Sequence, residues 1–306
     1  MGTPPEPTRD STDSRAARHG GRRRPRREAA FRRSFTSTLS VLDELAATGA
    51  RVSVHVRDLD RDSVVLAGDD YVTQPIGALG VVPLLIEVAA RFDDGSVDPL
   101  EIVERGDADA AGASGLWRHL AAPALPLRDV AVLAASAGDA RAANLLLERV
   151  GLEAVHRRIT EIGLARAAVL DRFRDERGPD DAPHFALGSA KELAEVFAAL
   201  VNTTLVSAAV SAQVAEWLCL NHDLSLVAAA TGLDPFAHDD DDHGLLFINK
   251  TGRDRGVRAE AGVLAGPRAG VAYALVVCFD DLSIMHRLRA HEAFRMLGVD
   301  LMEYVF

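Results

Sequence analysis

An amine and a hydroxyl stand side by side in this 306-residue chain, at Lys250 and Thr251, and Gly252 follows them. A nearby amine can take the proton of a hydroxyl, and a hydroxyl activated in this way can attack an acyl group. The pair therefore points to acyl transfer or to hydrolysis of an amide. Three residues alone are a weak signal, so the interpretation depends on the elements that would position them.

The triplet belongs to a C-terminal region that predicts three strands and a helix. The strands are expected over 244–250, 258–264 and 270–280, and the helix over about 285–305. Lys250 then stands at the end of the first of these strands, which fixes where its amine and the neighbouring hydroxyl lie relative to the sheet.

The N-terminal part of the chain predicts a helix and a hairpin. Apolar residues at helical spacing indicate an amphipathic helix over about 34–48. Residues 51–56 alternate between polar and apolar side chains, as a half-buried strand does, and 63–67 form the expected second strand.

The region between these parts is predicted to be mainly helical. An apolar run over 77–92 is too long for a strand and indicates a buried helix. Helices rich in alanine and leucine are expected over 127–137 and 140–150, and a polar loop over 170–184. Ser189 is the expected N-cap of a further helix. The order of elements predicts an α/β (α+β) fold, in which five strands are divided by a helical insertion.

Several stretches of the sequence occur in the same order as in a known superfamily. The chain resembles the class A serine β-lactamases and penicillin-binding proteins over about residues 34–306, through Gly112–Leu120, Ala142–Leu147, Leu170–Phe173 and Lys250–Gly252. The resemblance implies a five-stranded antiparallel sheet flanked by helices, beside an all-helical subdomain. The expected α/β part is about 34–76 and 205–306, and the expected all-helical part is about 77–204.

The resemblance also implies that reactive side chains are missing. The family places a nucleophilic serine and a lysine base, spaced S-x-x-K, at the start of a buried helix, where this spacing keeps both on one helical face. The matching positions are Gly77 and Gly80, which have no side chain. We expect this loss to open space above the helix N-terminus, where backbone donors favour an anion.

The family's S-D-N motif is altered in the same way. It corresponds to Gly138-Asp139-Ala140, so its hydroxyl and its amide are absent. Asp139 is expected to hold its loop together by accepting backbone N–H groups. Ser136 fits the motif only if the alignment shifts by two residues.

The polar loop lacks the family's catalytic glutamate. That glutamate activates the deacylating water in the family, and the resemblance aligns it with Arg174. Arg172 is expected to pair with Asp180 or Asp181 and so to brace the loop.

Charge is unevenly distributed along the chain. The whole sequence carries −11, whereas residues 1–33 hold ten arginines and four carboxylates, a net +6 that leaves −17 for the remainder. An acidic body argues against nucleic acid as a partner of the folded domain. Residues 1–33 are expected to form a disordered basic tail, with contact to phosphates or anionic lipid as the alternative.

Several features bear on compartment. No apolar run approaches the ~20 residues that a membrane span needs. Cys219 and Cys278 are expected to be reduced core thiols rather than a disulfide framework. Arg32-Arg33 superficially resembles a twin-arginine export signal, but the following segment carries acidic residues and has no clean apolar region. A cytoplasmic location is therefore expected.

One acidic run raises the question of a metal. Asp239–Asp242 lie between His238 and His243. Consecutive residues cannot all converge on one ion, so the run is interpreted as a solvated loop. No metal and no cofactor is expected.

Three functions fit these observations. The first is a catalytically degenerate pseudoenzyme that binds a small anion, an amide-containing metabolite or a protein partner in the former cleft, lined by Lys250, Thr251, Gly252, Asp139, Arg174, Trp117 and Arg253. The second is an enzyme with rebuilt chemistry, in which Thr251 and Lys250 act with Asp139 on an amide. The third is a helper protein of natural-product metabolism that binds an amide-containing intermediate.

Overall fold

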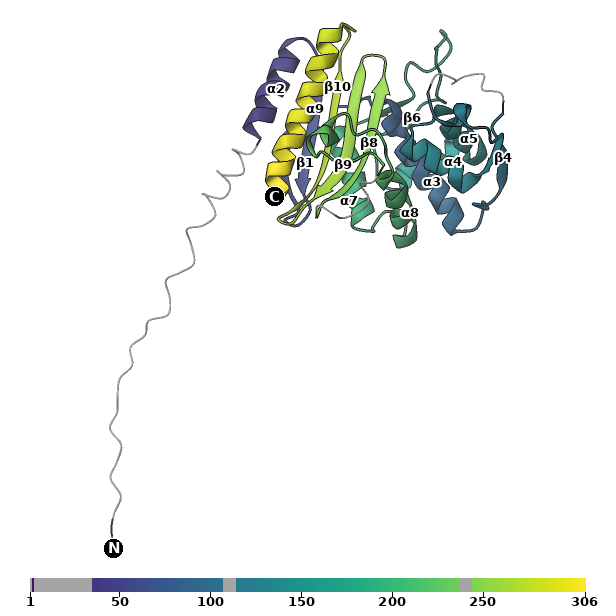
Figure 1. The fold of residues 1–306 in the computed structure, drawn as a ribbon, viewed down its shortest axis with the longest axis horizontal. Coiled ribbons are helices and arrows are strands. Elements are labelled where there is room, and N and C mark those ends of the chain that lie inside the picture. The colour runs from purple at the N-terminus through teal and green to yellow at the C-terminus, as the bar shows by residue number, and fades with distance from the viewer. Residues whose placement is uncertain (1, 3–34, 107–113, 237–243) are drawn as a thin grey trace.

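An antiparallel sheet and a helical layer lie side by side in the computed structural model, which describes residues 2, 35–106, 114–236 and 244–306. Within these residues five strands form an antiparallel sheet in the order β2-β1-β10-β9-β8 (Figure 1). The strands are β1 (Arg51–Asp58), β2 (Ser63–Gly68), β8 (Leu246–Asp254), β9 (Val257–Ala265) and β10 (Gly270–Cys278). This confirms the predicted sheet and places β8, with the Lys-Thr-Gly triplet, at an edge.

Two helices from opposite ends of the chain cover one face of the sheet. They are α2 (Thr36–Ala47) and α9 (Ile284–Val305), which run alongside each other in Figure 1. Leu42 and Leu45 of α2 are buried against the same core as the apolar face of α9. The backbone and hydroxyl groups of Thr38 both donate to Asp300, at 3.0 and 2.6 Å, which ties the two helices together.

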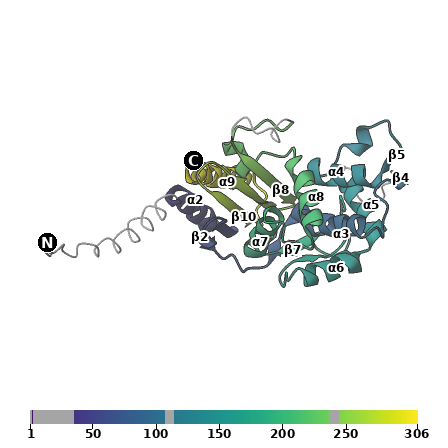
Figure 2. The ribbon, with the colours of Figure 1, turned by 90° about the horizontal axis from the view of Figure 1, so that it is seen from below.

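The other face of the sheet packs on α7 (Ala190–Val201), and the remaining helices lie beyond it (Figure 2). The Ser189 side chain accepts the Glu192 N–H, so the predicted N-cap is confirmed. Because α7 contacts β1, β9 and β10, this helix of the predicted all-helical part serves as the floor of the sheet. The helices beyond α7 are α3 (Val81–Asp93), α4 (Leu127–Ser136), α5 (Ala140–Val150), α6 (Leu152–Glu161) and α8 (Ala208–Cys219).

Short elements that the sequence did not predict connect the two layers. A small sheet joins β3 (Gln74–Pro75), β7 (Ala186–Gly188) and β6 (Ala168–Val169), and a second one joins β4 (Ile102–Glu104) to β5 (Ala124–Pro126). Three 3₁₀ turns complete the order: η1 (Gly77–Gly80), η2 (Trp117–His119) and η3 (Val227–Ala230). The predicted apolar helix over 77–92 is thus split, with a 3₁₀ turn before α3.

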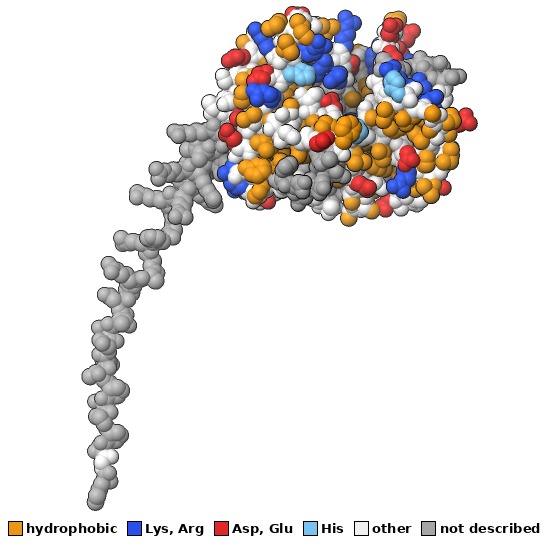
Figure 3. Space-filling model, viewed as in Figure 1, with side chains coloured by type: hydrophobic (Ala, Val, Ile, Leu, Met, Phe, Trp, Pro, Cys, Tyr) orange, Lys and Arg blue, Asp and Glu red, His pale blue; other side chains and the backbone are white. Residues whose placement is uncertain are grey.

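Acidic and basic side chains alternate with hydrophobic ones on the face drawn in Figure 3. No helix in the described part of the chain combines the length and the apolar character needed to cross a bilayer. The predicted basic tail over 1–33 and the acidic run Asp239–Asp242 lie outside the described residues, apart from Gly2.

Candidate functional site

A cavity of about 830 Å³ lies between the edge strand β8 and the helical layer. Its wall is built from η1, the turn between α4 and α5, the loop around Arg174, the segment after α8, and β8 itself. Charged or hydrogen-bonding side chains in this wall include Ser136, Arg174, Asp175, Arg177, Asn221, His222, Asp223, Lys250, Thr251, Arg253 and Asp254. The predicted cleft residues Lys250, Thr251, Arg174 and Arg253 therefore share one cavity.

Gly77 lines this cavity in a conformation that only glycine adopts readily. Its φ is +55°, and a Cβ built on it would lie 2.8 Å from the carbonyl carbon and oxygen of Arg253 and 2.9 Å from its backbone nitrogen. Real Cβ atoms do not approach backbone this closely, and a positive φ adds strain for other residues. The backbone of β8 thus occupies the space that a side chain at 77 would need.

Gly80 is closed in by the small sheet. A Cβ at this position would lie 2.2 Å from Ala186 Cβ and 2.8 Å from Phe185 Cε1. The prediction that two glycines open space above the helix N-terminus is therefore wrong, because neighbouring segments fill the volume that side chains at these positions would need.

Gly252 has a similar packing role. A Cβ there would lie 2.1 Å from the Ile76 carbonyl oxygen, so glycine lets β8 approach the residue before Gly77. Gly252 is not part of the cavity wall, and its predicted role in ligand contact is corrected to one in packing.

Asp139 and Trp117 lie behind the wall rather than in it. Asp139 is 1% exposed, caps α5 by accepting the Ala142 N–H at 3.0 Å, and accepts the Trp117 N–H at 2.7 Å. The Trp117 side chain is buried and its indole N–H donates to Ala122 O at 3.1 Å. The expected structural role of Asp139 is confirmed. The expectation that Asp139 and Trp117 line the cleft is wrong, because their polar groups form hydrogen bonds within the protein behind the wall.

The turn between α4 and α5 leaves room next to Lys250. Gly138 has a φ of +59°, and a Cβ built on it would meet only Lys250 Nζ, at 3.9 Å. Ala140 and Ser136 also border the cavity. The Ser136 hydroxyl donates back to Val132 O at 2.7 Å, so its proton is engaged within α4.

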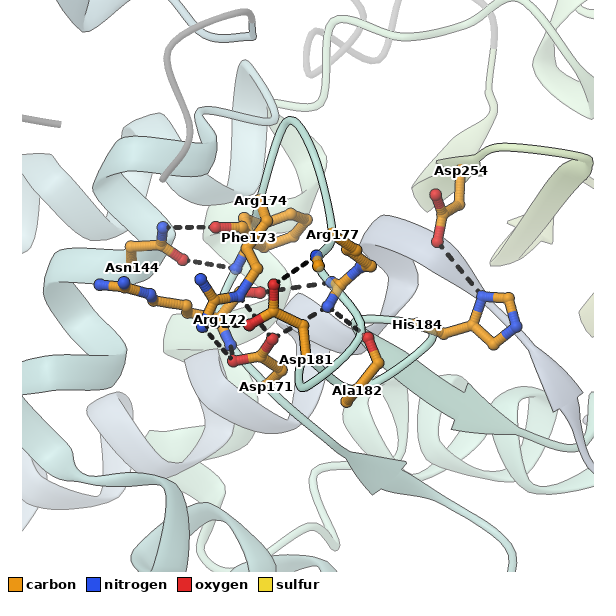
Figure 4. Close-up of polar contacts among 11 residues, drawn as sticks. Asn144, Asp171, Arg172, Phe173, Arg174, Arg177, Asp181, Ala182, His184 and Asp254 are labelled. Carbon is orange, nitrogen blue, oxygen red and sulfur yellow. Dashed lines mark hydrogen bonds and ion pairs between the residues drawn. The ribbon is translucent and has the colours of Figure 1, made fainter. Parts of the chain in front are cut away.

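Arg174 is held inside its own loop (Figure 4). Its guanidinium donates to Asp171 Oδ2 at 2.7 Å and lies 3.1 Å from Asp181 Oδ1. Arg177 also donates to Asp171, at 2.9 Å. Burial raises the pKa of Asp171, but hydrogen bonds and charge from these arginines outweigh this effect and hold the pKa below its usual range. The predicted brace from Arg172 is wrong; Arg174 and Arg177 supply it.

The same loop is fastened to α5 by a paired amide contact. Asn144 Nδ2 donates to Phe173 O at 2.9 Å, and the Phe173 N–H donates to Asn144 Oδ1 at 2.7 Å (Figure 4). The Phe173 ring stacks on Phe185 with centroids 3.8 Å apart. Arg174 is therefore presented to the cavity by a fixed loop, with its charge balanced by Asp171 and Asp181.

Lys250 is a buried amine at the base of the cavity. It is 2% exposed, and its Nζ donates to Ala135 O at 2.7 Å and lies 3.5 Å from Asn221 Oδ1. Burial lowers the pKa of Lys250 from 10.5 to about 8, and the charge of Asp223 opposes this shift. Because this pKa still lies above 7, the amine is mainly protonated at neutral pH. The charged amine has the Ala135 carbonyl and the Asn221 side chain as acceptors.

Asp223 is the carboxylate of this site that the sequence did not single out. Thr251 Oγ1 donates to Asp223 Oδ2 at 2.8 Å, and Arg253 Nη2 lies 4.0 Å from the same oxygen. Burial raises the pKa of Asp223, but hydrogen bonds from Ser225 and Thr251 and the charge of Arg253 hold it below its usual range. The available signal was the polar run Asn221–Asp223, directly after an apolar helix.

Lys250 and Thr251 are adjacent in sequence but direct their polar groups to different partners. Successive strand residues point to opposite faces. The Lys250 amine therefore reaches Ala135 on α4, whereas the Thr251 hydroxyl reaches Asp223. The predicted hydroxyl–amine pair is replaced by a hydroxyl–carboxylate pair.

A buried polar network continues from the cavity into the sheet. Asn221 Nδ2 donates to Asn249 Oδ1 at 2.8 Å, and Asn249 Nδ2 donates to Glu260 Oε1 at 2.9 Å. Glu260 also accepts the Tyr273 hydroxyl at 2.7 Å and the Val227 N–H at 2.8 Å. Burial raises the pKa of Glu260 to about 7, despite these hydrogen bonds.

Comparison with known proteins agrees with this fold. The profile described as the beta-lactamase enzyme family matches residues 35–305. The chain belongs to this family. No curated protein is significantly similar to it in sequence.

Solved structures of this family share the fold of the chain at low identity. A beta-lactamase from Sphaerobacter thermophilus superposes with a TM-score of 0.76 at 19% identity, covering 89% of this chain and 97% of that one. The penicillin-binding protein PBP-A gives 0.72 at 17%, covering 88% and 95%. The chromosome-encoded beta-lactamase of Vibrio parahaemolyticus gives 0.70 at 17%, covering 88% and 98%.

Within this beta-lactamase-family fold, the described residues offer few groups for metal binding. Within residues 35–106, 114–236 and 244–306, no group of three or more histidine, cysteine or acidic side chains is placed to hold a metal ion. The histidines that flank the acidic run, His238 and His243, lie outside this part of the chain. The cavity wall offers the Lys250 amine, three guanidinium groups and the Thr251 hydroxyl, together with the carboxylates of Asp175, Asp223 and Asp254.

Proposed function

We propose that this member of the beta-lactamase enzyme family is a pseudoenzyme that binds a small anionic ligand in the cavity beside β8. The single observation that carries the proposal is Gly77, where positive φ and contact with the Arg253 backbone leave no volume for a nucleophilic side chain. A comparable hydrolase loses about a millionfold in kcat without its serine. The site of action is proposed to be the cytoplasm, on the sequence grounds given above.

The ligand is proposed to be an anion because β8 contributes two cationic side chains to the cavity wall. Lys250 is fixed at its base, and the Arg253 side chain is 62% exposed at its rim. Arg174, in contrast, is offset by Asp171 and Asp181. Carboxylates and phosphates are the natural partners of such groups.

The absence of acyl transfer is tested by incubation with a penicillin followed by intact-mass spectrometry. We expect the mass of the protein to remain unchanged. A stoichiometric adduct that maps to a residue of the cavity would overturn the proposal.

Anion binding is tested by calorimetry with small carboxylates and inorganic phosphate at low and high salt. Affinity should fall with salt, because charged groups at the rim are screened. Arg253→Gln and Lys250→Met should each weaken binding. Arg255→Gln is the matched control, since Arg255 is exposed next to the same strand but does not line the cavity. Equal affinity of the wild-type protein and all three variants would place the anion site elsewhere.

A second candidate rests on the 2.8 Å contact between the Thr251 hydroxyl and Asp223. A hydroxyl within reach of a carboxylate has the arrangement of a nucleophile and its base, and would support hydrolysis of an amide. The low pKa of Asp223 makes it a weak base, which favours the binding function. Turnover of an amide that is retained in Thr251→Ser and lost in Thr251→Val would favour the enzyme.

A further inference from the structure

Asp223 places a carboxylate of the chain itself next to the cavity residues that β8 contributes. Asp223 belongs to the segment between α8 and η3, and its Oδ2 accepts the Thr251 hydroxyl at 2.8 Å. The same oxygen lies 4.0 Å from Arg253 Nη2, and the charge of Asp223 acts on Lys250 as well. One hydroxyl and one guanidinium of the cavity wall therefore lie next to the carboxylate of the chain itself, and the same carboxylate acts on the Lys250 amine through its charge.

Asp223 is held in this position from behind. Ser225 donates to Asp223 Oδ1 through its hydroxyl at 2.6 Å and through its backbone N–H at 3.2 Å. The amides of Asn221 and Asn249 donate to the Asp223 carbonyl oxygen at 3.2 and 3.5 Å. One carboxylate oxygen is thus fixed by its own turn, which leaves the other directed at Thr251.

A further guanidinium lies next to these groups across the sheet. Arg258 pairs with Arg253 in the β8–β9 ladder, and the charge of Arg253 lowers the pKa of Arg258, second to burial. The buried Nε of Arg258 has no hydrogen-bond partner in the part of the chain that the structure describes. Asp223 acts on both arginines as a counter-charge, so its removal would leave the two guanidinium groups without that charge.

We propose that the Asp223 carboxylate is a built-in occupant of the anion subsite formed by Thr251 and Arg253, and that an external carboxylate or phosphate binds there only by displacing it. This inference rests on the proposed function and adds a device to it. A ligand must compete with a tethered carboxylate for the same donors, and must avoid the repulsion between two like charges. Asp223 then lowers the affinity of the cleft for external anions. Only an anion that binds the donors more strongly than Asp223 does can displace it.

The test is calorimetry of the full chain with inorganic phosphate and with succinate. Asp223→Asn keeps the size of the side chain and removes its charge, so affinity should rise at least about tenfold, as expected for loss of a charge-assisted competitor. Asp254→Asn removes the same charge from the same cavity without contact to Thr251, and should raise affinity by no more than about threefold through screened electrostatics. Thr251→Val added to Asp223→Asn should abolish the gain.

A second variant keeps the test decisive if Asp223→Asn folds poorly. Ser225 is exposed, and its hydroxyl fixes the Asp223 carboxylate. Ser225→Ala removes this hydroxyl and should also raise the affinity for phosphate, by a smaller factor than Asp223→Asn. Equal affinity of the wild-type and Asp223→Asn proteins would overturn the inference and leave the proposed function intact. The same rise in Asp254→Asn would also overturn it. Failure of every protein to bind phosphate or succinate would reject anion binding and this inference together.

Discussion

Gly77, Gly80 and Gly252 lie where segments approach more closely than any side chain permits. The Arg253 backbone, the Ala186 Cβ and the Ile76 carbonyl take up the volume beside them, at 2.8, 2.2 and 2.1 Å from the positions that a Cβ would occupy. At the residue scale, the space beside these three glycines is therefore closed. A serine or lysine side chain at one of them would meet neighbouring backbone or side-chain atoms.

The first prediction is that Gly77→Ser destabilises the protein and gives no penicillin adduct. Gly95→Ser is the control, because Gly95 has a φ of +72° but no atom within 4 Å of its built Cβ. The control should cost about 1–2 kcal/mol for a left-handed conformation, and Gly77→Ser should cost about 1–3 kcal/mol more for overpacking. Urea unfolding and intact-mass spectrometry are the measurements. An acylated Ser at position 77 would contradict the structure.

Lys250 and Asp223 illustrate opposite responses to burial at this scale. Burial lowers the pKa of Lys250 to about 8 and raises the pKa of Asp223, but hydrogen bonds from Ser225 and Thr251 and the charge of Arg253 hold the pKa of Asp223 below its usual range. Asp223 thus stays ionised and Lys250 stays mainly protonated at neutral pH. The cleft carries both charges under ordinary conditions.

At the scale of elements, the loop over 170–184 and the edge strand β8 decide what the cavity presents. The loop is fastened by Asn144 and braced by two arginines that share Asp171. It therefore positions Phe173 and Arg174 without a regular secondary structure. Arg174, which the resemblance aligned with the family's glutamate, is part of the scaffold of its loop.

The second prediction follows from this brace. Asp171→Asn weakens two ion pairs, and should cost about 1–3 kcal/mol as hydrogen bonds to charged groups are lost. Hydrogen exchange should speed up across residues 170–184 and remain slow in β9 and β10. Asp180→Asn removes an exposed carboxyl of the same loop and is the control. Equal exchange in the two variants would mean that the pairs at Asp171 do not hold the loop.

At the scale of the whole molecule, a buried polar network links the cavity to the core of the sheet. Asn221 and Asn249 connect the surroundings of Lys250 to Glu260, which is fully buried beneath η3. Buried polar groups of this kind are strongly coupled to stability, since each needs its partners. Protonation of Glu260 should therefore register in global unfolding.

The third prediction is a dependence of stability on pH that Glu260 causes. Burial raises the pKa of Glu260 from 4.5 to about 7, so between these values the folded protein holds a proton that the unfolded chain releases. The contribution is complete below pH 4.5 and is lost as pH rises through 7, on the order of 3 kcal/mol. Urea unfolding from pH 4.5 to 8 is the measurement. Glu260→Gln should flatten this fall relative to wild type, and an unchanged slope would contradict it.

The fourth prediction concerns the N-terminal segment. Deletion of residues 1–33 should leave the melting temperature within experimental error, because this Arg-rich sequence has no apolar face to bury. Differential scanning calorimetry of the full and shortened chains is the measurement. A drop of several degrees would show that the basic segment stabilises the acidic domain, and would move the domain boundary.

The sequence by itself determined the fold. Periodicity placed the strands and helices, since amphipathic patterns are local. The resemblance aligned Gly77 and Gly80 with S-x-x-K, and from that alignment the loss of the usual nucleophile stays a prediction. The predicted Ser189 cap followed from the same local chemistry.

Only the tertiary structure decided what surrounds these residues. Asp223 meets Thr251 across 28 residues of chain, the backbone of Arg253 fills the space above Gly77, and Asp171 and Asp181 take up the charge of Arg174. Behind the cavity wall, the backbone N–H of Trp117 donates to the carboxylate of Asp139. Such outcomes depend on close packing and on pairing between distant segments, which no local pattern of residues encodes.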